Sequence, residues 1–217
     1  MLIRVLLVDD HAVVREGYRR LLEQDTSIRI VSEAADAATA YLNFRDIKPD
    51  VVVMDIALPD VSGLEALRRM LALQADARIL MFSMFEDAIY TQKALDAGAL
   101  GYLTKASAPE VLVSAVHQVA AGKTFVSEDA ARNLAQYAAT DCGAALQSLS
   151  VREFEILQLL VRGHTLNEIA ERLYLTQKTV ANIQSSVKQK LNAENSAQLV
   201  LITLKMGILV SGQLPTP

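Results

Sequence analysis

Cysteine, tryptophan and long apolar runs are scarce or absent in the sequence. Cys142 is the only cysteine, so no disulfide can form within the chain, which fits a reducing, cytoplasmic setting. No apolar run approaches the roughly 18 residues that a membrane span needs. The opening MLIRVLLVDD reaches acidic residues too early for a signal peptide. We therefore expect a cytoplasmic protein with no membrane partner.

The chain has 217 residues, which suggests one large domain or two small ones. A hydrophobic content of 52% and the lack of low-complexity segments predict ordered cores. Charge is uneven, because residues 1–147 carry 14 basic and 20 acidic side chains while residues 148–217 carry 7 and 5. The two parts are therefore expected to have different partners, although the slight basic excess is a weak sign of nucleic-acid binding.

Five short β-rich segments alternate with amphipathic segments up to about residue 122. The β-rich segments are residues 3–9, 28–34, 51–55, 78–84 and 101–105. Strands that alternate with helices of this length predict a parallel sheet covered on both faces. Five such units match a flavodoxin-like doubly wound fold and are too few for an eightfold barrel.

Strand signals end at Gly122. We predict a helix over about residues 128–139, a linker near 140–148 and a bundle of four helices after it. The starts of these four helices are marked by two capping-box pairs and two candidate caps, namely Ser150 with Glu153, Thr165 with Glu168, Thr176 and Ser196. A further capping-box pair, Ser107 with Glu110, marks the last helix before Gly122.

Acidic residues stand where two of the predicted strands end. Asp55 closes VVVMD, and Asp9 and Asp10 close VLLVDD. Burying a carboxylate is costly, but side chains at the carboxyl ends of such strands face a crevice, and the first and third strands can be neighbours there. Three converging carboxylates repel one another and need a cation. Oxygen ligands without thiols suit Mg²⁺.

Ser83 and Lys105 lie near the ends of the fourth and fifth strands, at the same edge of the sheet. A carboxylate nucleophile, a hydroxyl, an ammonium and Mg²⁺ are together suited to phosphoryl transfer. Each residue has an ordinary interpretation when taken singly, such as a helix cap for Asp9 or a solvated side chain for Lys105. The four strand ends taken together predict that Asp55 is phosphorylated.

Residues 1–122 resemble the receiver domain of two-component response regulators, through VLLVDD, VVVMDIALPDVSG, MFSM and AGALGYLTK. The resemblance implies that Asp55 accepts a phosphoryl group from a phosphohistidine of a sensor histidine kinase. It implies that Ser83 moves to contact this group and that Tyr102 swings inward behind it. Ala106 departs from the proline that many receivers have after Lys105, and a cis peptide bond is costly without proline. The implied ligands of Mg²⁺ are Asp9, Asp10, Asp55 and the backbone carbonyl of Ala57.

The segment LNEIAERLYLTQKTVANIQSSVKQKL predicts two helices joined by a turn at residues 174–176. Ala170 is small where the helices would cross. The second helix of a helix-turn-helix normally enters the major groove of DNA, but a two-helix hairpin without that function has the same periodicity. The expected core consists of Ile169, Leu173, Leu175, Val180, Val187 and Leu191.

Residues 147–210 resemble the LuxR-type DNA-binding domain, through LSVREFEILQLLVRG, EIAERL, LTQKTV and QKLN. Nearly the whole chain then resembles the NarL/FixJ class of transcriptional response regulators. The last helix is apolar almost all round, so part of it must pack on the bundle, and the resemblance implies that the remainder forms a dimer face; core and interface are both open. The implied domains are a receiver at 1–122, a linker with a helix at 123–146, the DNA-binding domain at 147–210 and a tail at 211–217.

Ala181 and Ile183 stand where LuxR-type recognition helices usually have lysine and histidine. Ile183 extends the apolar stripe of Val180 and Val187, so packing is gained while contacts to DNA are lost. Fewer contacts weaken binding and flatten its salt dependence, and a dimer could offset the loss. Polar residues remain that can read adenine or anchor phosphates, namely Gln177, Lys178, Thr179, Asn182, Ser185 and Lys188.

We therefore expect a phosphorylation-controlled transcription regulator, not an enzyme, whose partners are a sensor histidine kinase, promoter DNA and, once phosphorylated, a second copy. The alternative keeps the receiver but has the C-terminal domain act through dimerisation or a protein partner, because Ala181 and Ile183 replace residues that usually contact DNA.

Other classes of protein fit the sequence less well. A haloacid-dehalogenase-like phosphatase is disfavoured by Ala57, where a second aspartate is usual. A flavin module is disfavoured by the acids after the first strand, and three scattered histidines do not suggest a zinc site.

Overall fold

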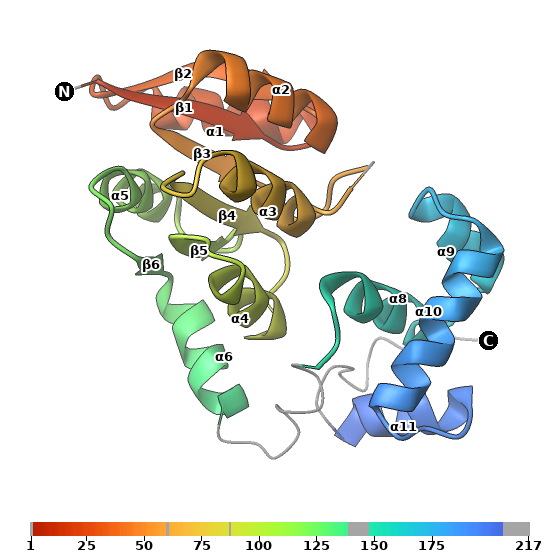
Figure 1. Ribbon diagram of the computed structural model, residues 1–217. Coiled ribbons are helices and arrows are strands. Elements are labelled where there is room, and N and C mark those ends of the chain that lie inside the picture. Colours follow the sequence, from red (N-terminus) through yellow and green to blue (C-terminus); the bar gives the residue numbers. More distant parts are fainter. Residues whose placement is uncertain (1, 60, 87, 139–147, 206–217) are drawn as a thin grey trace. The chain divides into compact units, whose positions relative to one another are not determined.

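The computed structural model describes residues 2–59, 61–86, 88–138 and 148–205 (Figure 1). The chain divides into two compact units, an N-terminal unit of residues 1–135 and a C-terminal unit of residues 136–217. Within the described ranges, every helix is too short or too polar to cross a membrane. Apart from Ser148, the predicted linker lies outside the described residues, as do Cys142 and the predicted tail.

A parallel sheet forms the centre of the N-terminal unit. Its strand order is β2-β1-β3-β4-β5-β6, which confirms the doubly wound fold and places the first and third strands side by side. The strands are β1 (Ile3–Val8), β2 (Ile28–Ala34), β3 (Val51–Met54), β4 (Ile79–Ser83), β5 (Gly101–Thr104) and β6 (Phe125–Val126). The prediction of five strands was wrong by one. β6 pairs with β5 over two residues, and so short a strand carries no periodicity that could be read.

Helices cover both faces of this sheet (Figure 1). On one face, alternate strand residues such as Val5 and Val53 pack against α1 and α5 residues such as Leu22 and Val116. Successive strand residues point to opposite faces, so Val52 is buried on the other side. The covering helices are α1 (Ala12–Leu22), α2 (Ala37–Ile47), α3 (Gly63–Leu73), α4 (Ala88–Asp96) and α5 (Pro109–Ala120), and a further helix, α6 (Glu128–Ala138), follows β6.

The start of α5 differs from the prediction. Its N-cap residue is Ala108, whose side chain makes no capping bond, and Pro109 opens the helix. Proline is favourable there because its missing N–H would have had no helical partner. The capping box predicted for Ser107 and Glu110 is therefore wrong, and the Ser107 hydroxyl instead lies 3.0 Å from that of Thr104.

The described part of the C-terminal unit consists of helices α8 (Val151–Val161), α9 (Leu166–Arg172), α10 (Gln177–Lys190) and α11 (Ser196–Lys205). Both predicted capping boxes are present at α8 and α9, and Thr176 caps α10. The cap predicted at Ser196 is wrong, because the Asn195 side chain accepts the hydrogen bond from the Gln198 N–H at 2.9 Å. Ile183 packs against the core around Val180, as its place in the apolar stripe predicted.

Candidate functional site

The carboxyl ends of four neighbouring strands bring together the polar residues predicted from the sequence. Asp9 follows β1, Asp55 follows β3, Ser83 ends β4 and Lys105 follows β5. Backbone hydrogen bonds extend the pairing beyond the strands, because the Asp55 N–H donates to the Val8 carbonyl at 2.9 Å and the Lys105 N–H to the Ser83 carbonyl at 2.8 Å. Asp9, Asp55 and Ser83 are buried. The sheet itself therefore fixes the positions of these groups.

The Lys105 ammonium lies between two buried carboxylates. Its Nζ atom is 2.6 Å from Asp9 Oδ2 and 2.5 Å from Asp55 Oδ2. Burial raises the pKa of Asp55 and outweighs the lowering effect of Lys105. Burial also opposes the charged form of Lys105, but the two carboxylates hold the pKa of its ammonium above the usual value. The site thus concentrates charge where isolated charges are costly.

Asp10 and His11 extend this acidic cluster towards solvent. Asp9, Asp10 and His11 each offer a potential metal-ligand atom, and these atoms lie within 4.8 Å of one another. His11 Nδ1 is 2.6 Å from Asp10 Oδ1, and the His11 N–H donates to Asp9 Oδ1 at 2.9 Å. Carboxylate oxygens suit Mg²⁺, so this edge of the sheet has a fitting donor set. The sequence analysis did not include His11 in this site, although its position directly after two aspartates could have indicated that it lies beside them.

The loop after β3 folds closely around Asp55. The Ala57 N–H donates to Asp55 Oδ1 at 3.2 Å, and the Gly63 N–H donates to the Ile56 carbonyl at 2.9 Å. A Cβ atom at position 63 would lie 1.9 Å from the backbone oxygen of Asp55. Only glycine permits this approach of α3 to the loop. The sequence motif contained Gly63, but no role had been assigned to it.

Phe85 links Ser83 to Tyr102. The Tyr102 hydroxyl donates to the Phe85 carbonyl at 2.7 Å, and the Phe85 N–H donates to Ser83 Oγ at 3.4 Å. The Phe85 ring stacks on Tyr90 with 4.2 Å between centroids. Tyr102 is fully buried, so its ring points inward in this structure. Sequence reasoning named Ser83 and Tyr102 but missed Phe85 between them.

The same loop is bonded to α6. The Asn133 side-chain amide donates to the Glu86 carbonyl at 2.9 Å. Glu86 lies three residues after Ser83, and α6 is the last described helix before residue 148. The loop that begins at the predicted switch residue Ser83 therefore contacts the helix that leads out of the N-terminal unit.

One face of α10 is open to solvent. Lys178, Asn182 and Ser185 are exposed, and their spacing of four and three residues places them on a single helix face. Val180 and Val187 are buried on the opposite face. The open face is therefore available to a partner along much of the helix.

The other predicted contacts on α10 flank this face. Gln177 is exposed, whereas Thr179 and Lys188 are half-buried. Two hydroxyls are engaged with the helix itself, because Thr179 Oγ1 lies 2.8 Å from that of Thr176 and Ser185 Oγ donates to the Ala181 carbonyl at 3.0 Å. Gln177, Lys178 and Asn182 are therefore the more available groups, and Lys188 lies half-buried beside them.

Glu153 anchors α10 to the start of α8. Its carboxylate accepts hydrogen bonds from Lys190 Nζ at 2.7 Å, Ser186 Oγ at 2.6 Å and the Ser150 N–H at 2.6 Å. Burial opposes ionisation, but these hydrogen bonds outweigh it and lower the pKa of Glu153 to about 2. The orientation of α10 is thus held by an ionised group.

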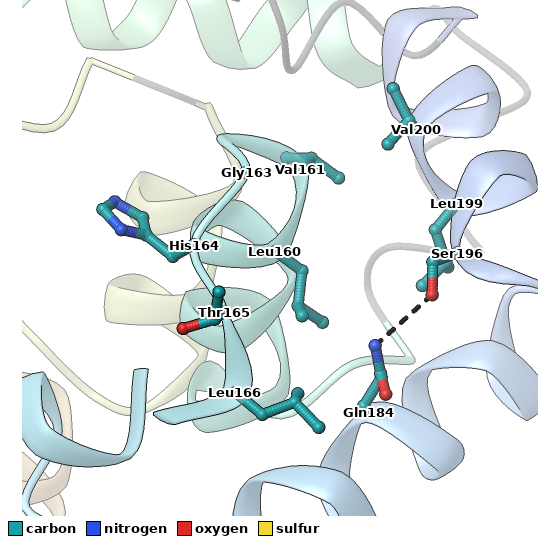
Figure 2. A pocket seen from close by; sticks show the side chains of 10 residues that line it. All are labelled: Leu160, Val161, Gly163, His164, Thr165, Leu166, Gln184, Ser196, Leu199 and Val200. Atoms are coloured by element: carbon teal, nitrogen blue, oxygen red, sulfur yellow. Dashed lines mark hydrogen bonds between the residues drawn. The ribbon is translucent and has the colours of Figure 1, made fainter. Parts of the chain in front are cut away.

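A cavity of about 260 Å³ lies between α8, α10 and α11 (Figure 2). Leu160 and Leu199 line it, and the Gln184 amide lies 3.5 Å from the Ser196 hydroxyl at its side. Leu199 is buried, whereas Leu201 is 58% exposed. The last helix therefore packs on the bundle, as expected, and also presents an exposed apolar side chain; a dimer face on it stays a prediction.

Two protein families match parts of this chain. The receiver domain of response regulators matches residues 5–117. The luxR family of bacterial regulatory proteins matches residues 147–203. The first match contains the acidic site, and the second contains α8 to α10 and most of α11.

Individual proteins match over nearly the full length. The chain is 36% identical to the response regulator UvrY of Escherichia coli K12, over 95% of this chain and 96% of UvrY. It resembles RcsB of Salmonella enterica serovar Typhimurium bound to promoter rprA with the phosphomimetic BeF3⁻, with a TM-score of 0.69, 25% identity and coverage of 93% and 98%. It also resembles a structure of two RcsB dimers bound to two parallel DNAs, with a TM-score of 0.63, 26% identity and coverage of 94% and 98%.

Proposed function

The chain belongs to the bacterial response regulators that join a receiver domain to a LuxR-type DNA-binding domain, and we propose that Asp55 is its phosphoacceptor and α10 its DNA-reading helix. The observation that carries the proposal is the Lys105 ammonium, which pairs with both Asp9 and Asp55 at the strand ends. The receiver domain is proposed to span residues 1–122, followed by a connecting segment at 123–146, the DNA-binding domain at 147–210 and a tail at 211–217.

The proposed reaction forms an acyl phosphate on Asp55. A carboxylate oxygen of Asp55 attacks the phosphorus of a phosphohistidine on a sensor histidine kinase, and the phosphorus–nitrogen bond breaks as the phosphorus–oxygen bond forms. Lys105 and the Ser83 hydroxyl bind the phosphoryl oxygens. Asp9, Asp10, Asp55 and the Ala57 carbonyl would hold Mg²⁺, which supplies positive charge beside those oxygens when bound.

The switch is proposed to run through Phe85 and Glu86. When Ser83 turns to the phosphoryl group, its contact with the Phe85 N–H is lost, and Phe85 is bonded to Tyr102. Glu86 is bonded to Asn133 of α6. A shift of this loop is therefore transmitted both to the face formed by α4, β5 and α5 and to α6. The phosphorylated state favours dimerisation and DNA binding.

DNA binding is proposed for the open face of α10 together with Lys188 on its flank. Lys178 and Lys188 supply charge for phosphates, and Asn182 can read adenine. RcsB, which this chain resembles over both domains, has been solved with promoter DNA and as dimers on DNA. Two subunits would double the contacts and offset the apolar residues at positions 181 and 183.

Two assays test the proposal. Incubation with acetyl phosphate and Mg²⁺ should phosphorylate the protein but not an Asp55→Asn variant, and equal labelling would exclude Asp55 as the acceptor.

The second assay measures DNA binding. Binding to random duplex DNA should weaken as salt rises. A double Lys178→Ala and Lys188→Ala variant should flatten that slope, whereas Lys123→Ala, in the N-terminal unit, should not. A slope unchanged by the double variant would favour the alternative, a C-terminal domain with a protein partner.

A further inference from the structure

Three helices of the C-terminal unit end in the same hydrogen-bonded turn. In each turn the helix is followed by one residue with positive φ, and the next residue donates its N–H to a carbonyl five positions back. The positive-φ residues are Gly163 at 89°, Tyr174 at 52° and Asn192 at 52°. The closing bonds run from His164 to Leu159, from Leu175 to Ala170 and from Ala193 to Lys188, at 3.1, 2.8 and 2.8 Å. Glycine is favoured at this position, and asparagine is the usual substitute.

Tyr174 is the exception among the three. A Cβ atom is disfavoured in the left-handed region, and a large side chain gains nothing there from local hydrogen bonds. The side chain is 70% exposed, so core packing does not compensate for this strain. The turn is secured without it, because the Arg152 guanidinium donates to the Leu173 carbonyl at 2.6 Å. Folding therefore gives no reason for a tyrosine at this position.

The place of Tyr174 in the helix-turn-helix supplies a reason. It lies in the turn between α9 and α10, two residues before Thr176, which caps α10. In this motif the first helix crosses the DNA backbone and the start of the second contacts bases, so the turn lies near the sugar–phosphate strand. Strained backbone concentrates at functional sites, where a side chain must be held in one place.

We propose that Tyr174 contacts the DNA backbone, with its hydroxyl donating to a phosphate oxygen and its ring packing on the neighbouring sugar. This inference rests on the proposed DNA binding by α10. This contact supplements those made by the polar groups of α10, where the apolar residues Ala181 and Ile183 provide no hydrogen bond or charge to DNA. An exposed aromatic ring that costs stability in the free protein is thereby used in the complex.

The test measures stability and DNA affinity together in the full chain. Tyr174→Asn should raise the thermal midpoint of the C-terminal unit and weaken binding to a fluorescein-labelled random duplex by about three- to tenfold. Tyr174→Phe should leave the midpoint unchanged and lose part of the affinity. Asn192→Tyr, the reciprocal change at the equivalent turn of α10, should lower the midpoint without raising affinity.

The outcomes distinguish the proposed DNA binding by α10 from the proposed backbone contact of Tyr174. If the wild-type protein does not bind the duplex, the proposed function fails and this inference falls with it. If the wild type binds and Tyr174→Asn binds equally well, DNA binding stands and the role of Tyr174 is refuted. A midpoint lowered by Tyr174→Asn would also overturn the inference, since it would show that the tyrosine serves the fold.

Discussion

Replacing Glu153 with glutamine tests how α10 is held against α8. The pKa of Glu153 is about 2 in the folded protein, against an ordinary value of 4.5. At 1.36 kcal/mol per pH unit, this difference corresponds to about 3 kcal/mol of stability at neutral pH. Glutamine has the same shape but no charge, and it leaves Lys190 without its carboxylate partner. We expect Glu153→Gln to lower the free energy of unfolding of the C-terminal unit by about 2–3 kcal/mol at pH 7.

The effect has a defined pH dependence. A carboxyl group whose folded pKa is lowered stabilises the protein fully above its unfolded value, here 4.5, and this contribution is lost as the pH falls towards about 2. The stability difference between wild type and Glu153→Gln should therefore shrink across that window. Hydrogen exchange of α8 and α10 peptides in the full chain, measured between pH 7 and pH 3, follows the difference. Glu171→Gln, an exposed change on α9, is the control. A difference that stays constant in acid would refute the role given to the Glu153 charge.

Three further perturbations address the N-terminal unit. Gly63→Ala should destabilise it by about 3 kcal/mol, because the added Cβ would lie 1.9 Å from the Asp55 carbonyl oxygen, and a thermal melt measures this; an unchanged midpoint would mean that the loop moves freely. Lys105→Met leaves Asp9 and Asp55 buried without their cation, which should cost about 3–5 kcal/mol and abolish labelling by acetyl phosphate. Near-normal labelling would contradict the role of Lys105. Asn133→Ala removes the hydrogen bond to Glu86, so the gain in DNA affinity on adding phosphodonor should fall by about fivefold while unphosphorylated binding stays the same. If the variant keeps the full gain in DNA affinity, the switch does not act through the hydrogen bond between Glu86 and Asn133.

The strand ends were predictable because two independent signals coincide there. The first, third, fourth and fifth β-rich runs each end in or beside a polar residue, and parallel strands bring their carboxyl ends to one edge. The sequence therefore predicted that Asp9, Asp55, Ser83 and Lys105 would meet. It could not predict that Lys105 would pair with both carboxylates, because that depends on the path of a flexible side chain.

Other features depend on tertiary contacts that leave no periodic trace. β6 exists because Phe125 and Val126 reach the open edge of β5. The need for glycine at position 63 arises from the approach of α3 to the Asp55 backbone. The cap at Asn195 was missed by one residue, which is an ordinary error when adjacent residues can both cap. The strain at Tyr174 became visible only when its turn could be compared with those at Gly163 and Asn192.

The most direct test of the central claim is capture of genomic DNA fragments by the purified full-length protein, with and without acetyl phosphate and Mg²⁺, beside the Asp55→Asn variant. We predict a discrete set of promoter fragments, enriched more strongly when the phosphodonor is present, and no such gain for the variant. If wild-type Asp55 is phosphorylated normally and no fragment is enriched in either state, the C-terminal domain does not act on DNA and the account is contradicted.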